Sequence, residues 1–218
     1  MMEHIYADGH EFTRRVFGED REICRKMRAG LRPRPARIRC GSYDFVFDAC
    51  ADGQQLKCLT IIDEWTRERL EIDVQGSIRS GRVIELLSRL ISVHGAPRYL
   101  RSDNGTEFVS RAVLRWLHRA GIDTALIDPG KPWQNGSDES FNGKFRDECL
   151  SMEWFRTCAE AKVVIEQCRQ HYNADRLHSS LDYLSPSMFK QQSEEQQNKI
   201  LRKQRKQKPS TNPGATLN

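Results

Sequence analysis

Residues 43–63 read YDFVFDACADGQQLKCLTIID, in which the turn residues Ala51-Asp52-Gly53 separate two β-favouring runs. The first run covers Tyr43–Cys50 and the second covers Leu56–Asp63. A third β-favouring run follows at Arg69–Val74, with no helical pattern before it. Three successive strands without an intervening helix form an antiparallel meander most economically. The stretch therefore predicts half of a sheet, made of three antiparallel strands.

The hydrophobic period then changes from two to about 3.6 residues, which is typical of helices. One helix is predicted to end near Gly95-Ala96-Pro97 and a second near Gly121. Short strands are predicted at Tyr99–Leu100 and Ile122–Ile127. The order β-β-β-α-β-α-β indicates an α/β fold, with a mixed five-stranded sheet of three antiparallel strands plus two parallel strands, flanked by helices. The apolar stripes of the two helices comprise Val83, Leu86, Leu87, Leu90 and Ile91, and then Phe108, Leu114 and Leu117.

The rest of the sequence predicts mainly helix. A loop rich in Pro, Gly and Asn covers Pro129–Gly136, and helix resumes near Ser137. A further helix is expected over Ala159–Tyr172. Ser185-Pro186 predicts another helix start, with Ser as the N-cap and Pro at the first helical position. Few apolar residues occur beyond Lys190, so disorder is predicted there.

The composition indicates a globular protein with one domain and modest extensions. The chain has 218 residues, of which 38% are hydrophobic and 30% charged. No apolar run approaches the roughly 18 residues that a membrane-spanning helix needs, and the charged start does not resemble a signal peptide. The seven cysteines include no C-x-x-C pair, which favours reduced thiols. A cytoplasmic protein without a membrane partner is therefore expected.

The net charge of +5 is unevenly distributed. Residues 1–40 carry ten Lys and Arg against six Asp and Glu, and residues 195–218 carry six against one. These flanks carry +9 together, which leaves −4 for residues 41–194. Basic flanks suit a polyanionic partner such as nucleic acid, but solvated disordered tails have the same composition. Charge alone leaves both readings open.

Three carboxylates stand where the predicted fold can bring them together. Asp44 lies in the first strand, Asp103 follows the end of the fourth, and Glu139 opens the helix after the flexible loop. The first and fourth strands are expected to be neighbours, and ligands collect beyond strand ends in such sheets. Three carboxylates form a hard-oxygen site suited to Mg²⁺ or Mn²⁺, and a pair of such ions suits phosphoryl transfer.

Each carboxylate also has an ordinary structural reading. An Asp near a strand end often caps a turn, and a Glu in the first turn of a helix offsets the helix dipole. Chemistry alone cannot select Asp44, Asp103 and Glu139, because other acidic residues lie in similar positions: Asp48, Asp63, Asp73 and Asp138.

Four sequence motifs distinguish the trio. They are SYDFV at 42–46, RSDNGTEF at 101–108, GKPWQN at 130–135 and ESFNGKFRDE at 139–148. With them, the chain resembles insertion-sequence transposases of the IS-three group, which share the integrase catalytic core of the DDE superfamily. Thirty-five residues lie between Asp103 and Glu139, as in the D-D-35-E signature of that group.

The resemblance implies an RNase H-like fold and a DNA transposase of the polynucleotidyl transferase type. Asp44, Asp103 and Glu139 would be the catalytic residues and the ligands of two Mg²⁺ or Mn²⁺ ions. In the implied reaction, water or a 3′-hydroxyl attacks a phosphodiester at the element end, and the released 3′-hydroxyl attacks another phosphodiester. DNA is the implied substrate for cleavage and strand transfer, and self-association on DNA is implied as well.

Five residues are candidates for DNA contacts: Lys131, Asn135, Asn142, Lys144 and Arg146. Arg146 lies seven residues beyond Glu139, nearly two helical turns, so the two residues are predicted to share a helix face. On that face Arg146 is expected to meet DNA phosphate. A loop lysine such as Lys131 is commonly only solvated.

The resemblance continues through Tyr172-Asn173-x-x-Arg176-x-His178 and covers about residues 41–190. Arg176 and His178 fit either DNA binding or a hydrogen-bonded structural pair.

The resemblance also predicts a division into three parts. Residues 1–40 are a basic lead-in, read as a truncated DNA-binding region, residues 41–192 are the catalytic core, and residues 193–218 are a disordered basic tail. Members of the group usually carry a helix-turn-helix region before the core, so a separately encoded helix-turn-helix protein is an expected partner. Two other readings stay open: a catalytically inactive DNA-binding remnant, and an RNase H-like nuclease acting on RNA–DNA hybrids.

Overall fold

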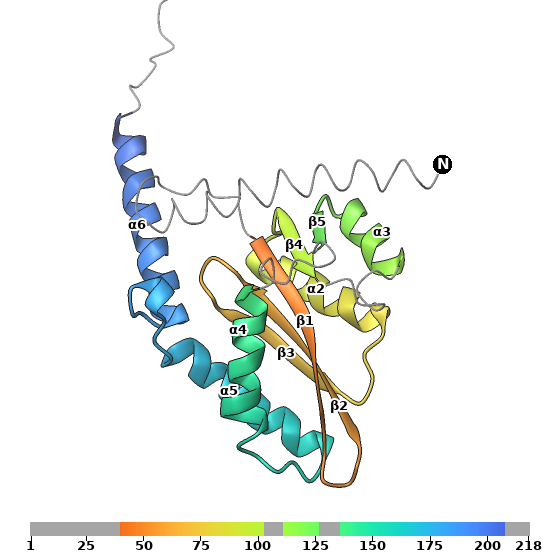
Figure 1. Cartoon of the computed structure of the whole chain (residues 1–218). Coiled ribbons are helices and arrows are strands. Elements are labelled where there is room, and N and C mark those ends of the chain that lie inside the picture. The colour runs from red at the N-terminus through yellow and green to blue at the C-terminus, as the bar shows by residue number, and fades with distance from the viewer. Residues whose placement is uncertain (1–39, 103–110, 127–135, 208–218) are drawn as a thin grey trace, which may run out of the picture.

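The computed structural model describes the backbone of residues 40–102, 111–126 and 136–207, and the side chains of all of these except 125–126, 136–140 and 205–207. Its centre is a five-stranded sheet with the order β3-β2-β1-β4-β5 (Figure 1). The predicted mixed sheet is therefore confirmed. Its strands are β1 (Cys40–Ala49), β2 (Gln55–Asp63), β3 (Arg69–Gln75), β4 (Tyr99–Ser102) and β5 (Asp123–Leu126).

The strand pairing follows the predicted pattern. β1 pairs with β2 and β2 with β3 in antiparallel fashion, because short turns connect them. The first of these turns contains Gly53 at φ 82°, a left-handed conformation that glycine adopts without strain. β4 lies parallel to β1, with Ser42 opposite Arg101, and β5 lies parallel to β4. The central strand of the sheet is therefore β1, with the fourth strand beside it as predicted.

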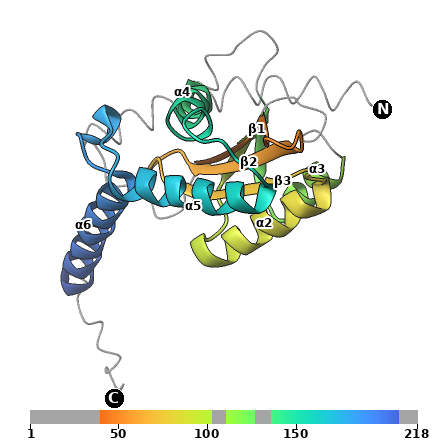
Figure 2. The ribbon, with the colours of Figure 1, turned by 90° about the horizontal axis from the view of Figure 1, so that it is seen from below.

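Helices cover both faces of the sheet. The sheet lies between α4 (Gly136–Phe145) on one side and α2 (Ser80–His94) with α3 (Arg111–Arg119) on the other (Figure 2). α5 (Cys158–Ala174) runs along β3, the edge strand. Side chains alternate along β1, as the period of a strand requires. Tyr43 and Phe45 consequently pack with α2 and α3, whereas Val46 packs with α4 and α5.

The helix α4 does not end at Phe145 but continues into one turn of π-helix, η2 (Arg146–Leu150). Single π-helical turns inside helices occur often at functional sites. Two buried residues of η2, Cys149 and Leu150, belong to the same apolar cluster as α4 and α5. The sequence predicted a helix here and did not predict the change of helical type.

The last described helix is α6 (Pro186–Gln207), and its length shows that the prediction for the tail was wrong. Disorder was predicted beyond Lys190, but the helix continues to Gln207 (Figure 1). The N-cap prediction agrees with the structure, since Ser185 Oγ accepts a hydrogen bond from the Met188 N–H. Lys190 bonds to Glu68 at 2.7 Å, and Phe189 packs on Trp65, so the first turns are attached to the core. Gln, Glu, Lys and Arg have high helix propensity, and most of them lie exposed along the extension of this anchored helix.

Several predictions fall outside the described residues. They concern the basic lead-in up to residue 39, the end of the tail after residue 207, the loop at 129–135 and Phe108. Within the described part, none of the six cysteines forms a disulfide. No helix in that part is both long enough and apolar enough to cross a membrane.

Candidate active site

Asp44 lies near the middle of the central strand β1, on the face that α4 covers. Its side chain is half-buried. Oδ1 accepts a hydrogen bond from the Phe45 N–H at 2.7 Å, and Oδ2 accepts one from Asn142 Nδ2 at 2.6 Å. Both donors are neutral groups, and their bonds orient the carboxylate.

Asn142 of α4 is the residue that links the helix to this carboxylate. A carboxylate only accepts hydrogen bonds, so the Asn142 side chain must present its NH₂ group to Asp44. The other end of the amide, Oδ1, is buried and has no hydrogen-bond partner among the described residues. Asn142 was predicted to contact DNA, whereas the structure places its side chain against Asp44, and the predicted DNA contact stays untested. No local pattern indicates this pairing, because the two residues are 98 positions apart.

Arg146 makes the next contact between this helix and β1. It opens η2, its side chain is exposed, and Nη1 donates to the Phe47 carbonyl at 3.3 Å. Asn142 and Arg146 are four residues apart and therefore lie on one side of the helical segment. Together they attach that side to β1 at Asp44 and Phe47. Lys144 of α4 is exposed.

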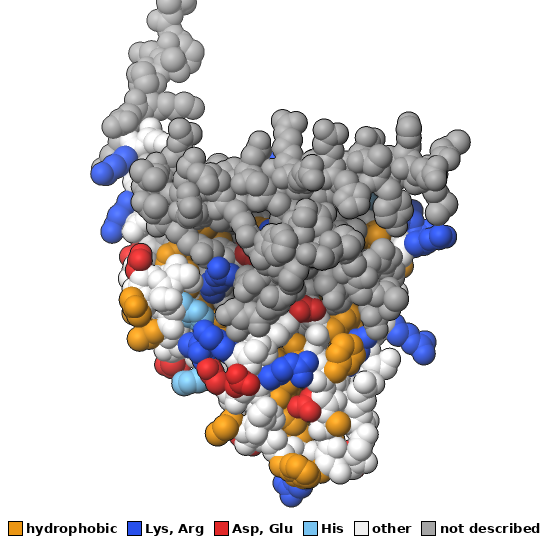
Figure 3. Space-filling model, in the orientation of Figure 1, with side chains coloured by type: hydrophobic (Ala, Val, Ile, Leu, Met, Phe, Trp, Pro, Cys, Tyr) orange, Lys and Arg blue, Asp and Glu red, His pale blue; other side chains and the backbone are white. Residues whose placement is uncertain are grey.

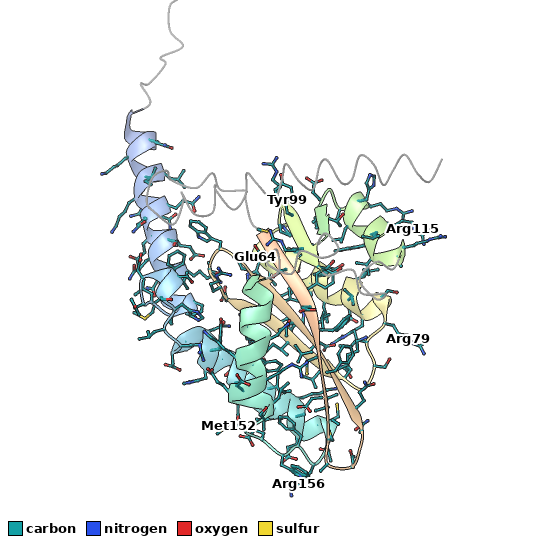
Figure 4. All side chains as sticks on the ribbon, viewed as in Figure 1. Glu64, Arg79, Tyr99, Arg115, Met152 and Arg156 are labelled. Atoms are coloured by element: carbon teal, nitrogen blue, oxygen red, sulfur yellow. The ribbon has the colours of Figure 1, made fainter. Side chains whose placement is uncertain are left out.

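A buried ion pair supports the sheet beside Asp44. Arg101 of β4 lies opposite Ser42 of β1, so it shares the sheet face of Asp44. Its Nη1 is 3.2 Å from Oε1 of Glu64, and the two side chains are only 8% and 10% exposed. Glu64, labelled in Figure 4, also donates its backbone N–H to the Cys40 carbonyl at the start of β1. Sequence reasoning missed this pair, although two charged residues beside β-favouring runs were a visible signal.

The remaining predicted site residues are only partly described. Asp103, Lys131 and Asn135 lie outside the described residues, and for Glu139 only the backbone, within α4, is described. No group of three Asp, Glu, His or Cys side chains that could hold a metal ion occurs within the described part. Of the predicted trio, Asp44 is therefore the residue whose side-chain hydrogen bonds the structure describes.

The described surface around the site has mixed charge. On the face shown in Figure 3, Lys and Arg side chains lie interspersed with Asp and Glu. A cavity of about 660 Å³ lies elsewhere, between α6, the end of α2 and the start of β1, and neither Asp44 nor Asn142 lines it. Large pockets are common ligand sites, but this one does not include the predicted carboxylate Asp44.

The family comparison gives two matches, both to integrase core domain models. One covers residues 34–132 and the other residues 120–186, so together they include β1, β4 and α4. Position 44, position 103 and position 139 all fall within these matched regions.

Two curated relatives come from bacterial insertion elements. The uncharacterized 39.2 kDa protein of IS476 from Xanthomonas euvesicatoria is 43% identical over 189 residues, covering 83% of this chain and 55% of the relative. The uncharacterized 31.7 kDa protein of IS407 from Burkholderia multivorans is 48% identical over 148 residues, covering 68% of this chain and 53% of the relative. The chain spans about half the length of these relatives.

A solved structure agrees with the fold. The HTLV-2 integrase catalytic core domain in complex with magnesium, in its trimeric form, superposes with a TM-score of 0.52 at 14% identity. The superposition covers 70% of this chain and 96% of that domain, which shows that the fold is RNase H-like. The predicted resemblance is confirmed: the chain belongs to the integrase core domain family and is related to proteins of bacterial insertion elements.

Proposed function

We propose that this chain carries the catalytic core of a DNA transposase, which cleaves a phosphodiester at the end of its element and joins the 3′-hydroxyl to another phosphodiester. The observation that carries the proposal is the hydrogen bond between Asn142 and Asp44. It brings α4, the helix that contains position 139, onto the strand that contains Asp44.

The strand register supports the same grouping for Asp103. The last described pair between β1 and β4 is Ser42 with Arg101. Asp44 follows Ser42 by two residues, and Asp103 follows Arg101 by two residues. Neighbouring parallel strands with this register favour a common site for the two carboxylates. Glu139 precedes Asn142 by three residues, about one helical turn.

The donor set fits Mg²⁺ or Mn²⁺. Asp44 offers a carboxylate oriented by neutral donors, and the Asn142 Oδ1 beside it is a buried oxygen without a hydrogen-bond partner in the described part. Hard divalent cations prefer such oxygen atoms. We propose that Asp44, Asp103 and Glu139 hold two ions. When bound, such ions activate the attacking oxygen and stabilise charge on the leaving oxygen.

The chain's own residues would orient the reactants. Asn142 fixes the Asp44 carboxylate, so its lone pairs have a defined direction before DNA binds. Arg146 is exposed at the α4–η2 junction, and its guanidinium is bonded to the Phe47 carbonyl. This places one positive group three positions from Asp44 along β1, where a DNA phosphate is proposed to bind. Lys131, Asn135, Asn142 and Lys144 stay proposed DNA contacts.

The proposed partners are DNA, further copies of the chain and a separately encoded helix-turn-helix protein. The core would comprise residues 41–192, with basic flanks at 1–40 and 193–218 that bind DNA backbone. A cytoplasmic location is part of the proposal, because the substrate is DNA and the described cysteines form no disulfide.

Cleavage and strand transfer on labelled DNA carrying the element ends would test the proposal. We expect Mg²⁺- or Mn²⁺-dependent products from the wild-type chain and none from Asp44→Asn, Asp103→Asn or Glu139→Gln. Asp48→Asn is the matched control, because Asp48 also lies on β1 and also accepts the N–H of the following residue. Equal activity of Asp44→Asn and Asp48→Asn would refute the assigned role. A folded wild-type chain that binds DNA without any products would favour the inactive remnant.

A further inference from the structure

We propose that Arg69 and the segment Tyr172-Asn173-x-x-Arg176 form a clamp that holds α4 and η2 in register on the sheet. In this inference, which rests on the proposed function, Arg69, Tyr172, Asn173 and Arg176 are positioning residues. They fix the helix that carries Glu139 and Asn142 relative to the strand that carries Asp44.

The clamp begins with a backbone attachment at the sheet edge. Arg69 is the first residue of β3, the edge strand. Its N–H donates to Asn173 Oδ1 at 2.8 Å, and its carbonyl accepts from Asn173 Nδ2 at 3.0 Å. Arg169 Nη1 donates to the same carbonyl at 2.7 Å. The buried Asn173 amide thus makes the pair of bonds that another strand would make, and it ties the last turn of α5 to β3.

The Arg69 side chain then reaches across to α4. Its guanidinium lies 3.3 Å from the centre of the Phe141 ring and 4.7 Å from that of Tyr172. Nη2 donates to the Tyr172 hydroxyl at 3.0 Å. The Tyr172 ring meets Phe141 edge to face, with 5.3 Å between ring centres. Phe141, only 4% exposed, is therefore held from two elements at once by contacts with defined directions.

Phe141 directly precedes Asn142, the residue bonded to Asp44. Successive helical residues point about 100° apart, so one side chain faces the clamp while the next faces β1. A rotation of α4 about its axis would break both sets of contacts. Holding Phe141 therefore sets the angle at which Asn142 approaches Asp44.

A second attachment lies on η2, seven residues beyond Phe141. Arg176, just after α5, donates to Glu148 of η2. The helix is consequently held at two points, one on each side of Arg146. His178 packs its ring against Tyr172 with 5.0 Å between centres, and its N–H donates to the Leu184 carbonyl. These contacts attach Tyr172 to the segment that follows Arg176.

Direct DNA binding is a poorer account of the same residues. Arg69 is 2% exposed, so a phosphate in solvent cannot reach its guanidinium. Arg176 is already paired with Glu148, whose carboxylate would repel a phosphate. Contacts within the protein thus account for the motif Tyr172-Asn173-x-x-Arg176.

Mn²⁺ binding to the full-length chain, followed by the electron paramagnetic resonance signal of free Mn²⁺, tests the clamp without requiring catalysis. Asp44→Asn serves as the reference and should abolish specific binding. We expect Arg176→Glu to weaken Mn²⁺ binding about tenfold, in the range found when groups that orient metal ligands are removed. Combining it with Glu148→Arg restores an ion pair of reversed polarity and should restore most of the affinity.

The control exchanges another pair in which one side chain is about half exposed and the other about a quarter exposed. Arg89 of α2 bonds to Glu71 of β3 at 2.6 Å, and its reversal, Arg89→Glu with Glu71→Arg, should leave Mn²⁺ binding unchanged. Tyr172→Leu should weaken binding like Arg176→Glu, while Tyr172→Phe keeps the ring contacts and should retain most of it.

The possible outcomes distinguish a failure of the proposed function from a failure of the clamp alone. Unchanged Mn²⁺ binding in Asp44→Asn would overturn the proposed function itself. Binding lost in Asp44→Asn but unchanged in Arg176→Glu and Tyr172→Leu would overturn the clamp alone. A loss in Arg176→Glu that Glu148→Arg does not repair would also overturn it. The exposed position of the Arg176–Glu148 pair keeps this test available even if Tyr172→Leu does not fold.

Discussion

Asn142 on α4 donates a hydrogen bond to Asp44 on β1 over 2.6 Å, while its own carbonyl oxygen stays buried without a hydrogen-bond partner in the described part of the chain. This contact joins two motifs that lie 98 residues apart. It also explains why α4 has the polar side chain of Asn142 close to two buried apolar residues, Phe141 and Phe145.

The first prediction concerns this amide. Asn142→Leu keeps the approximate size of the side chain but removes the donor to Asp44, so the carboxylate loses a bond that orients it. We expect strand transfer to fall about 10- to 100-fold, as for other groups that orient metal ligands. Thermal unfolding should show that the fold is kept. Asn198→Leu, on the exposed side of α6, is the control, and equal activity of the two variants would remove Asn142 from the site.

The second prediction concerns the buried pair of Arg101 and Glu64. Removing one partner leaves the other charge buried, so Arg101→Leu should cost about 3–5 kcal/mol of unfolding free energy. The double variant Arg101→Leu with Glu64→Leu should recover most of that loss, because two apolar groups can replace a buried ion pair. Urea unfolding of the single and double variants measures both quantities. A double variant less stable than either single one would contradict this reading.

The third prediction concerns pH. Burial, followed by the charge of Arg176, lowers the pKa of His178 to about 4. The folded state therefore keeps this ring neutral while the unfolded chain binds a proton near the usual histidine pKa of about 6.5. The contribution of the neutral His178 ring to the free energy of unfolding is therefore complete above about pH 6.5. It is lost as the pH falls towards the pKa of His178 in the folded state.

His178→Phe keeps a ring against Tyr172 and removes the titration. We expect its melting temperature to fall less steeply than that of the wild type between about pH 6.5 and 4. Parallel curves for the two proteins over that interval would show that His178 does not titrate as stated.

The fourth prediction tests the helical tail. Gln197→Pro removes a backbone donor inside α6 and disrupts the following turns. The helical signal in far-ultraviolet circular dichroism should decrease, while the core unfolds at the same temperature. An unchanged signal would mean that residues beyond Lys190 contribute no helix, as the composition alone had indicated.

Much of the fold could be predicted from local patterns. The alternation in Tyr43–Cys50 and the helical stripe from Val83 to Ile91 reflect which face each residue buries, and the structure has strands and a helix there. The adjacency of the first and fourth strands was expected for a sheet with this order of elements, and the structure has it. The prediction of disorder beyond Lys190 was wrong. Low hydrophobicity argues against a buried core but does not exclude an exposed helix that is anchored at Phe189 and Lys190.

The site was less predictable, because its bonds cross long distances in the sequence. The partner of Asn142 is set by how α4 lies on β1, and no pattern within α4 indicates it. The same holds for Asn173, whose amide bonds to the backbone of Arg69 across 104 residues. Spacing could group Asp44 with Asp103 and Glu139, but it could not identify the residues that hold them in place.

The most direct test of the central claim replaces the Asp44 carboxylate with a thiolate. A thiolate is a poor ligand for Mg²⁺ and a better one for Mn²⁺, which is the softer ion. Asp44→Cys should therefore give no strand transfer with Mg²⁺ and regain activity with Mn²⁺, while Asp48→Cys should be active with both ions. Full Mg²⁺-dependent activity of Asp44→Cys would contradict the claim that Asp44 is a metal ligand in a DNA strand-transfer site.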